Sequence, residues 1–457
     1  MKHIHILGVC GTFMASLAIL AKELGYKVTG SDAHIYPPMS DLLANNDIPI
    51  VSGYDETIFP VKCDLVIVGN ALTRGDPIIE AMLNEGFLYQ SGPAWLYENV
   101  LKHKHVLCVA GTHGKTTTAS MLASILKSAN LDPGFLIGGV CPELGRSACL
   151  GSGDYFVIEG DEYDTAFFDK RSKFIHYHPK TLVLNNLEFD HADIFDTLAD
   201  IQKQMHHLIR IIPSEGLIIH NALSPALDDV LKKGLWSHTE AFGLGRFNDA
   251  NWQAVLDKPD GSEFSLFHHK KEVARVCWNL LGQHNVQNAL AAAIAANHIG
   301  VPLDIIAKAL SAFKGVKRRL ECIGTVEKIT VYDDFAHHPT AIKTTLNGLR
   351  ALVGEKGRII AVFEPRSNTM KMGVHGQSLV DAFNGADSLW ALIPEGLSWD
   401  MKGSFSGMAG FNAHQQLPTL IDGLIHYLMP GDHVVIMSNG GFGGVHQKLL
   451  DKLSTVS

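Results

Sequence analysis

Short apolar runs rich in β-branched residues alternate with longer stretches of helical pattern along the chain. This alternation predicts an α/β protein with parallel sheets covered by helices. A new series of such runs begins at residues 3–7, at 106–110 and at 329–332. Ligands of parallel sheets bind beyond the carboxyl ends of the strands, so the residues that follow each strand are the first candidates for function.

The same patterns predict the elements inside each series. They are a helix at 14–24 and a strand at 27–29 in the first; a helix at 115–128, strands at 155–158 and 181–184 and a helix at 285–296 in the second; strands at 358–363 and 433–437 in the third. At about 150 residues per domain, a chain of 457 residues suggests three domains. We place them at 1–103, 104–316 and 317–457.

Composition and charge narrow the class of protein. A net charge of -9 argues against a general nucleic-acid binder, which spreads Lys and Arg along one face. The seven cysteines include no C-x-x-C pair, which favours a reducing compartment over a disulfide framework. Gly8 and Gly11 interrupt the apolar run at 4–21, and no run reaches the roughly 18 apolar residues of a membrane span. We therefore expect a cytoplasmic protein without membrane insertion.

The turn after the strand at 106–110 has the composition of a phosphate-binding loop. It reads Gly111-Thr112-His113-Gly114-Lys115-Thr116-Thr117. Backbone N–H groups and a helix N-terminus favour anionic phosphate, a lysine adds a full positive charge, and the following hydroxyl can coordinate magnesium. The spacing departs from G-x-x-x-x-G-K-[ST], because Val109 stands where that motif has its first glycine.

This loop resembles the ATP-binding loop of the Mur ligase family and of its folylpolyglutamate synthase relatives. Two later segments resemble further family motifs, in the expected order: Glu159-Gly160-Asp161-Glu162-Tyr163-Asp164 and Asn185-Asn186-Leu187-Glu188-Phe189-Asp190-His191. The resemblance implies a Rossmann-like first domain, a central P-loop ATPase-like α/β domain and a Rossmann-like third domain. It also implies ATP and Mg²⁺, with Thr116, Glu159 and His191 as metal ligands.

Three more segments resemble family elements. The motif that begins at Gly282 implies that Asn285 and Asn288 approach the nucleotide, whereas plain helix capping by Asn285 is the structural alternative. By the same resemblance, Arg319 faces the γ-phosphate and Asp334 contacts the ribose or the arginine itself. Because these two residues follow the second boundary, the third domain completes the site only when it swings toward the central domain.

The first domain opens on a glycine element that resembles the family's cradle for the diphosphate of a UDP-sugar. We take seven residues as substrate-binding candidates there: Gly8, Gly11, Thr12, Ser31, Asp32, Asn70 and Ala71. The element superficially resembles an NAD fingerprint but lacks the G-x-G-x-x-G spacing. A folate-type relative would not carry this domain, so its presence favours a muramyl substrate.

The resemblance implies that ATP phosphorylates the carboxylate of UDP-N-acetylmuramate and that an amine then attacks the acyl phosphate, with Lys115 and Arg319 neutralising charge. Within the family, the segments at 164–173 and 364–373 resemble the branch whose amine is L-alanyl-γ-D-glutamyl-meso-diaminopimelate, in peptidoglycan recycling. The alternative is the branch that adds L-alanine. Arg366 is the candidate clamp for a peptide carboxylate, by bidentate geometry.

Two other classes remain open on the sequence. An NAD-dependent oxidoreductase built on the first domain is disfavoured by the glycine spacing and by the loop at 111–117. A nucleotide sensor would use Lys115 to bind ATP without turnover. No obligate protein partner is predicted in any of these interpretations.

Overall fold

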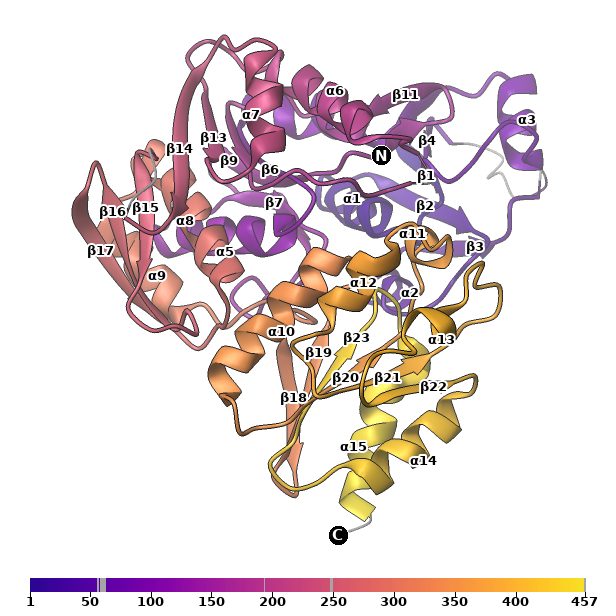
Figure 1. The fold of residues 1–457 in the computed structure, drawn as a ribbon. Coiled ribbons are helices and arrows are strands. Elements are labelled where there is room, and N and C mark those ends of the chain that lie inside the picture. Colours follow the sequence, from indigo (N-terminus) through magenta and orange to yellow (C-terminus); the bar gives the residue numbers. More distant parts are fainter. Residues whose placement is uncertain (56, 58–62, 193, 247–249, 456–457) are drawn as a thin grey trace.

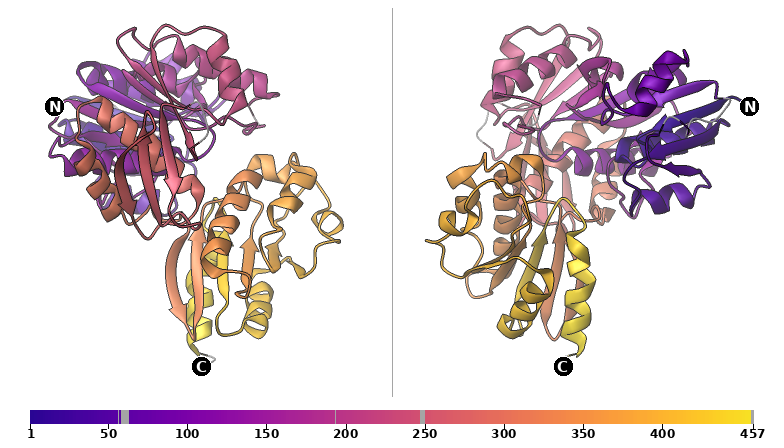
Figure 2. Two further views of the ribbon diagram at one scale, coloured as in Figure 1. Left: turned by 60° about the vertical axis from the view of Figure 1, so that its left-hand side comes forward. Right: turned by 90° about the vertical axis from the view of Figure 1, so that its right-hand side faces the viewer.

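The structure is a computed structural model that describes residues 1–55, 57, 63–192, 194–246 and 250–455. Three sheets follow one another along the chain, each flanked by helices (Figure 1). In both views of Figure 2 the part from β18 onward projects from the rest of the molecule, with the C-terminus at its far end. The α/β class and the three-part architecture expected from the sequence are confirmed.

The first sheet has five parallel strands in the order β3-β2-β1-β4-β5. Its strands are β1 (His3–Leu7), β2 (Lys27–Asp32), β3 (Ile50–Ser52), β4 (Leu65–Val68) and β5 (Tyr89–Ser91). Its helices are α1 (Thr12–Glu23), α2 (Met39–Ala44), α3 (Pro77–Asn84) and α4 (Gly92–Asn99). All five residues of β1 are buried, because this strand lies at the centre of the sheet.

The central sheet has ten strands in the order β17-β16-β15-β14-β13-β12-β6-β9-β7-β8. Its strands are β6 (His105–Ala110), β7 (Gly134–Leu136), β8 (Ala148–Cys149), β9 (Tyr155–Gly160), β12 (Thr181–Leu184), β13 (Leu217–Asn221), β14 (His238–Leu244), β15 (Trp252–Leu256), β16 (Glu263–His268) and β17 (Lys271–Cys277). Strands β10 (Asp164–Ala166) and β11 (Asp169–Ser172) form a separate hairpin. The 3₁₀ helix η2 (Leu101–His103) ends the first part of the chain. The helices of the central part are α5 (Lys115–Ser128), η3 (Lys173–His176), α6 (Leu198–Ile209), α7 (Pro225–Lys232), α8 (Gln283–His298) and α9 (Leu303–Ala312).

The third sheet has six strands in the order β18-β19-β23-β20-β21-β22. Its strands are β18 (Glu321–Val326), β19 (Ile329–Asp334), β20 (Ile359–Phe363), β21 (Ser388–Leu392), β22 (Phe411–His414) and β23 (His433–Met437). Its helices are α10 (Pro339–Val353), α11 (Asn368–Lys371), α12 (Gly376–Ala382), α13 (Met401–Ser404), α14 (Leu417–Tyr427), η4 (Phe442–Gly444) and α15 (Val445–Thr455).

Most predicted elements are present, and the differences have local causes. The sequence predicted parallel sheets, but β15, β16 and β17 form an antiparallel meander at one edge of the central sheet. At the edge of the third sheet, β18 also runs antiparallel to its neighbour β19. Strand β2 continues through Asp32, which the sequence placed beyond the strand, because Gly30, Ser31 and Asp32 pair with β3.

A continuous hydrophobic core joins the first and central sheets. It includes Leu17 and Trp95 from the first sheet's helices and Ile158 and Phe174 from the central part. The third sheet has its own clusters, one on each face. The first two parts are therefore held together by buried apolar surface, whereas the third packs around a separate core. Among the described residues, none of the helices combines the length and the hydropathy required for a transmembrane helix.

The shared core predicts that Phe174 and Phe168 contribute unequally to the free energy of unfolding. Phe174 is fully buried and Phe168 is 42% exposed. We expect Phe174→Ala to destabilise the first and central parts by about 3–5 kcal/mol, because a buried aromatic ring leaves a cavity. Phe168→Ala, the matched control, should cost about 1 kcal/mol or less. Urea unfolding followed by tryptophan fluorescence measures both; equal losses would contradict the shared core.

One buried and one partly buried histidine on central strands predict that the protein is less stable in acid. Burial lowers the pKa of His5, on β1, and of His105, on β6, to about 4 in each case. The unfolded chain binds protons below about pH 6.5 and the folded chain does not, so stability falls as the pH drops from 6.5 toward 4. We expect a double variant with Gln at both positions to lose less stability over this range than the wild type. Thermal unfolding between pH 7.5 and 4.5 tests this, with the exposed His426→Gln as control; identical slopes would contradict it.

Candidate functional site

Two glycines shape the loop between β6 and α5. Gly111 has φ 130° and Gly114 has φ 81°, values that L side chains rarely adopt. A Cβ at Gly114 would lie 2.4 Å from the side-chain oxygen of Asn288, on α8. The loop therefore packs directly against α8 because position 114 has no side chain.

The amides of this loop divide into two groups. Thr112 N–H donates to the backbone oxygen of Asn186 at 3.2 Å, and His113 N–H donates to the Asn186 side chain at 2.8 Å. These two amides therefore fix the loop to the turn after β12. The N–H groups of Lys115, Thr116 and Thr117 begin α5, where helix geometry supplies no backbone acceptor, so they form the anion-binding end of the loop.

The Lys115 ammonium turns back toward the loop and the acidic turn after β9. Its Nζ donates to the backbone oxygen of Gly111 at 2.6 Å and to the Glu162 carboxylate at 3.1 Å. Only 16% of the Lys115 side chain is exposed. Burial alone would lower the pKa of Lys115, but Glu162 and Asp161 outweigh it and raise that pKa. The lysine is therefore held in its charged form.

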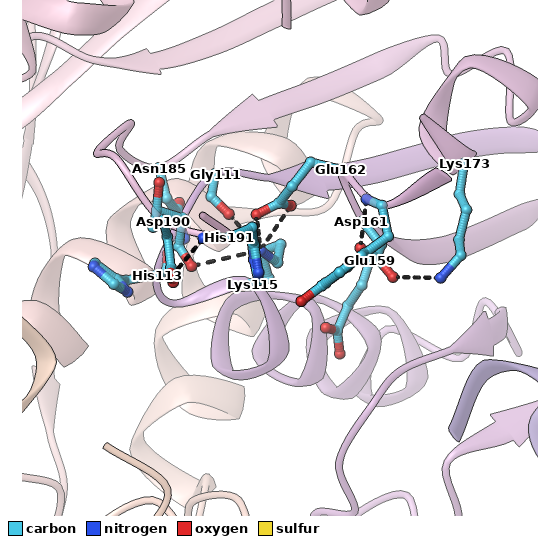
Figure 3. A network of polar contacts seen from close by, with 12 residues as sticks. Gly111, His113, Lys115, Glu159, Asp161, Glu162, Lys173, Asn185, Asp190 and His191 are labelled. Atoms are coloured by element: carbon cyan, nitrogen blue, oxygen red, sulfur yellow. Dashed lines mark hydrogen bonds and ion pairs between the residues drawn. The ribbon is translucent and has the colours of Figure 1, made fainter. Parts of the chain in front are cut away.

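Glu162 also binds His191, so one carboxylate joins Lys115 and His191, two of the four residues predicted to be catalytic together with Glu159 and Arg319 (Figure 3). His191 Nε2 lies 3.0 Å from Glu162 Oε1. Burial opposes the charge on His191, but Glu162 raises its pKa overall. Burial likewise opposes the charge on Glu162, and Lys115 together with His191 lowers its pKa. Asp161 makes a separate ion pair with Lys173 at 2.9 Å.

Glu159 faces the other side of the loop. Its Oε2 accepts a hydrogen bond from the Thr116 hydroxyl at 3.1 Å, and its Oε1 accepts from Gly138 N–H at 2.5 Å. Burial raises the pKa of this carboxyl, although both hydrogen bonds oppose the shift. Thr116 and Glu159 thus present two neighbouring oxygens of the type that Mg²⁺ prefers.

The positively charged guanidinium of Arg319, in the third domain, lies beside Thr116 of the phosphate loop. One guanidinium nitrogen lies 3.5 Å from the Thr116 hydroxyl, and the group stacks on Phe335 at 5.0 Å. Burial raises the pKa of Asp334 to about 6, although Arg319 opposes that shift. Asp334 accepts from the N–H groups of Leu320 and Ala336, at 2.6 and 2.7 Å. It therefore fixes the segment that carries Arg319.

The two asparagines of α8 differ from plain capping residues. The N-cap of α8 is Gly282 and no side chain caps the helix, so the capping alternative for Asn285 is wrong. Asn285 donates instead to Leu281 O at 2.8 Å. Asn288 accepts from Asn185 at 3.3 Å, which joins α8 to the turn after β12.

A cavity of about 840 Å³ collects most of the predicted nucleotide-binding residues. Its lining includes Thr112, His113, Gly114, Lys115, Thr116, Thr117, His191, Asn285, Asn288, Arg319 and Asp334. Gly111 and Glu159 are not in the lining: Gly111 accepts from Lys115, and Glu159 accepts from Thr116. Residues from two domains, far apart in the sequence, thus surround one space.

A second cavity, of about 290 Å³, contains Arg366. The Arg366 side chain passes over Gly440, where a Cβ would lie 2.4 Å from its Cδ. Tyr163, Ser367, Asn368, Thr369 and Asn439 also line this cavity. Asp190, His191 and His337 line both cavities, so the two spaces adjoin at the turn after β12.

The first-domain candidates lie at the carboxyl edge of their own sheet. Gly8 has φ 75° and, like Gly11, Thr12, Asn70 and Ala71, is at least partly accessible. Ser31 and Asp32 are buried: Ser31 lies 3.3 Å from His5, and Asp32 accepts from Cys10 N–H at 2.8 Å. None of these seven residues lines the two cavities described above. Their contact with a substrate stays a prediction.

Four residues of the acidic and asparagine motifs were not predicted as site residues, yet their contacts build the site. Glu162 accepts a hydrogen bond from Lys115, and Asn185 donates one to Asn288 on α8. Asn186 accepts from the phosphate loop, and Glu188 accepts from Thr340 in the third domain. The signal was present, because several polar residues follow one strand end in each motif. Which of them faces the loop depends on the path of the turn, and the sequence does not define that path.

Family models match almost the whole chain in three successive parts. Residues 3–104 match the Mur ligase family catalytic domain, residues 109–296 the Mur ligase middle domain, and residues 318–440 the Mur ligase glutamate ligase domain.

Individual relatives agree with the family models. The chain is 52% identical over 456 residues to the UDP-N-acetylmuramate–L-alanyl-γ-D-glutamyl-meso-2,6-diaminoheptandioate ligase of Haemophilus influenzae, covering 99% of each chain. It is 31% identical to the UDP-N-acetylmuramate–L-alanine ligase of Desulforamulus reducens, over 99% of this chain and 98% of that one. The crystal structure of a murein peptide ligase from Psychrobacter arcticus is 47% identical, covers both chains fully and superposes with a TM-score of 0.77. With these matches, and with the phosphate loop, the turn after β12 and Arg319 lining one cavity, the chain belongs to the Mur ligase family.

Proposed function

We propose that the protein joins L-alanyl-γ-D-glutamyl-meso-diaminopimelate to UDP-N-acetylmuramate, with ATP as the phosphate donor, in peptidoglycan recycling. Members of the Mur ligase family are ATP-dependent ligases that form amide bonds. The observation that carries the proposal is the meeting of two cavities at Asp190, His191 and His337. One cavity holds the phosphate loop and the other holds Arg366, so a phosphoryl donor and a carboxylate-bearing peptide have adjoining spaces.

The choice of the tripeptide rests on similarity. Relatives named for ligation of this tripeptide are 52% and 51% identical to the chain, whereas six L-alanine ligases matched by sequence are 29–34% identical. The exposed guanidinium of Arg366 adds a physical reason, because free alanine brings one carboxylate and the tripeptide brings several. The same similarity favours a ligase over a nicotinamide-dependent oxidoreductase or a nucleotide sensor.

The residues around the loop fit ATP and Mg²⁺. Thr116 and Glu159 offer adjacent oxygens, and His191 would join them by exchanging its Glu162 contact for the cation. A magnesium ion held there would neutralise charge on the phosphate oxygens. Gly111, Thr112, His113, Gly114 and Thr117 would cradle the phosphates, while Asn285, Asn288 and Asp334, which line the cavity of about 840 Å³, would approach the nucleoside.

The proposed reaction needs positioning and charge neutralisation more than covalent chemistry from the protein. The muramyl carboxylate attacks the γ-phosphorus of ATP and ADP leaves, which gives an acyl phosphate. The free amine of the peptide then attacks the acyl carbon, and phosphate leaves with the amide formed. Lys115 and Arg319 would stabilise the charge on the transferred group.

The first domain would bind the UDP-sugar. Gly8, Gly11, Thr12, Ser31, Asp32, Asn70 and Ala71 would contribute to the binding of the UDP-sugar, Ser31 and Asp32 by holding the glycine turn from within. We also propose domains at 1–103, 104–316 and 317–457, action in the cytoplasm, and no obligate protein partner.

Replacing Lys115 tests the phosphate loop. We expect Lys115→Ala to lower kcat on the order of 10²–10³-fold, because it removes a charge aimed at the transferred phosphoryl group. Lys127→Ala, at the exposed end of the same helix, should change kcat little. ADP release and amide formation measure both variants, and circular dichroism checks the fold. A Lys115→Ala protein with normal ligation would remove the loop from the mechanism.

Substrate preference tests the tripeptide. ATP-dependent ligation to UDP-N-acetylmuramate should favour the tripeptide over L-alanine, and a clear preference for alanine would replace our proposal. We further expect Arg366→Lys to lower kcat/KM for the tripeptide about 10–100-fold, the effect of losing a charged hydrogen bond of about 1.5–3 kcal/mol. Arg210→Lys, an exposed control, should leave it unchanged. An unchanged kcat/KM in Arg366→Lys would assign peptide binding to other residues.

A further inference from the structure

Within the part of the chain that the structure describes, one group of three side chains has the donors and spacing of a metal site: His113, Glu188 and His338. One ligand atom from each lies within 4.8 Å of the others. The group does not include Thr116, Glu159 or His191, to which the proposed function assigns Mg²⁺.

The distances between the donor atoms of these side chains approach the distances between the ligands of a coordinated metal ion. His113 Nε2 lies 3.3 Å from Glu188 Oε2, and His338 Nδ1 lies 3.7 Å from the same oxygen. Ligands bound tetrahedrally at about 2.0–2.1 Å from a metal lie roughly 3.3–3.4 Å apart. Movements of about an ångström or less per side chain would therefore complete the geometry.

Hydrogen bonds to neighbouring groups hold the side chains of Glu188 and His338 in place. Thr340 Oγ1 donates to Glu188 Oε2 at 2.6 Å. His338 Nε2 lies 3.4 Å from the backbone oxygen of Phe189, which leaves Nδ1 as the nitrogen that faces the cluster. A ligating histidine commonly makes this kind of contact through its second nitrogen. Nδ1 also accepts from Thr340 N–H at 3.3 Å, a long hydrogen bond that a metal would replace.

The types of donor atom in the group indicate which class of metal ion it binds. Two imidazoles and one carboxylate suit a borderline divalent transition-metal ion such as Zn²⁺, whereas Mg²⁺ prefers oxygen ligands. All three residues line the cavity of about 840 Å³, so an ion can reach them from that space. We propose that His113, Glu188 and His338 form a Zn²⁺-type site distinct from the magnesium site.

The position of the site gives it a mechanical consequence. His113 belongs to the phosphate loop and Glu188 follows β12, both in the central domain, whereas His338 is the N-cap of α10 in the third domain. A bound ion ties the third domain to the phosphate loop. Zn²⁺ therefore stabilises the packed arrangement of these two domains, and its binding needs both.

Metal binding to the full-length, nucleotide-free protein tests the site. The probe is Zn²⁺ alone, in competition with a colorimetric chelator, and Co²⁺ reports low coordination number through its visible absorption. We expect one tight Zn²⁺, and a loss of affinity of more than about 100-fold in His338→Ala and in Glu188→Gln, since loss of an outer partner alone costs 10–100-fold. Zn²⁺ should raise the melting temperature of the wild type but not of these variants.

Two control variants separate this site from others. The chain has 24 histidines, so His426→Gln, an exposed position outside the cluster, measures the background and should bind Zn²⁺ as the wild type does. Glu159→Gln should also keep the tight Zn²⁺. The proposal is overturned if both cluster variants bind like the wild type, or if Glu159→Gln alone removes the ion. Glu188→Gln keeps the volume of the side chain, so a folded variant is available even if His338→Ala does not fold.

Discussion

The buried charge of Lys115 is the constraint on which the candidate site depends. An ammonium with 16% of its side chain exposed is costly unless carboxylates surround it, and Glu162 and Asp161 meet that requirement. The same carboxylates would be costly without the lysine. His191 and Lys173 complete the charge balance on either side. The phosphate loop, the turn after β9 and the turn after β12 are therefore fixed relative to one another by electrostatics.

The three domains are joined by different kinds of contact. A continuous apolar core joins the first and central domains, which disfavours movement between them. The third domain meets the central one through polar contacts such as Thr340–Glu188, at 2.6 Å, and Arg319–Thr116, at 3.5 Å. Polar contacts of this kind exchange with water at low cost. Relative motion of the third domain, expected from the position of Arg319 in the sequence, is thus compatible with how the domains pack.

Much of the fold could be predicted because, in the central strands, the pattern of apolar positions and the residue types both indicate a β-strand. β1, β12, β23 and α5 have the predicted boundaries, since each strand is a mainly apolar run and α5 begins directly after the glycine of the phosphate loop. The meander β15–β17 could not be predicted as antiparallel, because its direction depends on which neighbour each strand finds. The edge strand β18 was missed for a different reason: its partially exposed residues give no strong apolar signal.

The sequence by itself determined the chemistry available: a glycine loop with Lys115, acidic residues after β9 and arginines at the start of the third domain. Only the tertiary structure decided the pairings. It joined Lys115 to His191 through Glu162, set Glu159 against Thr116, and turned Ser31 inward to His5. The physical reason is that residue type and strand order place a polar group at a sheet edge. The path of the turn and the packing of distant segments then determine which neighbour that group meets.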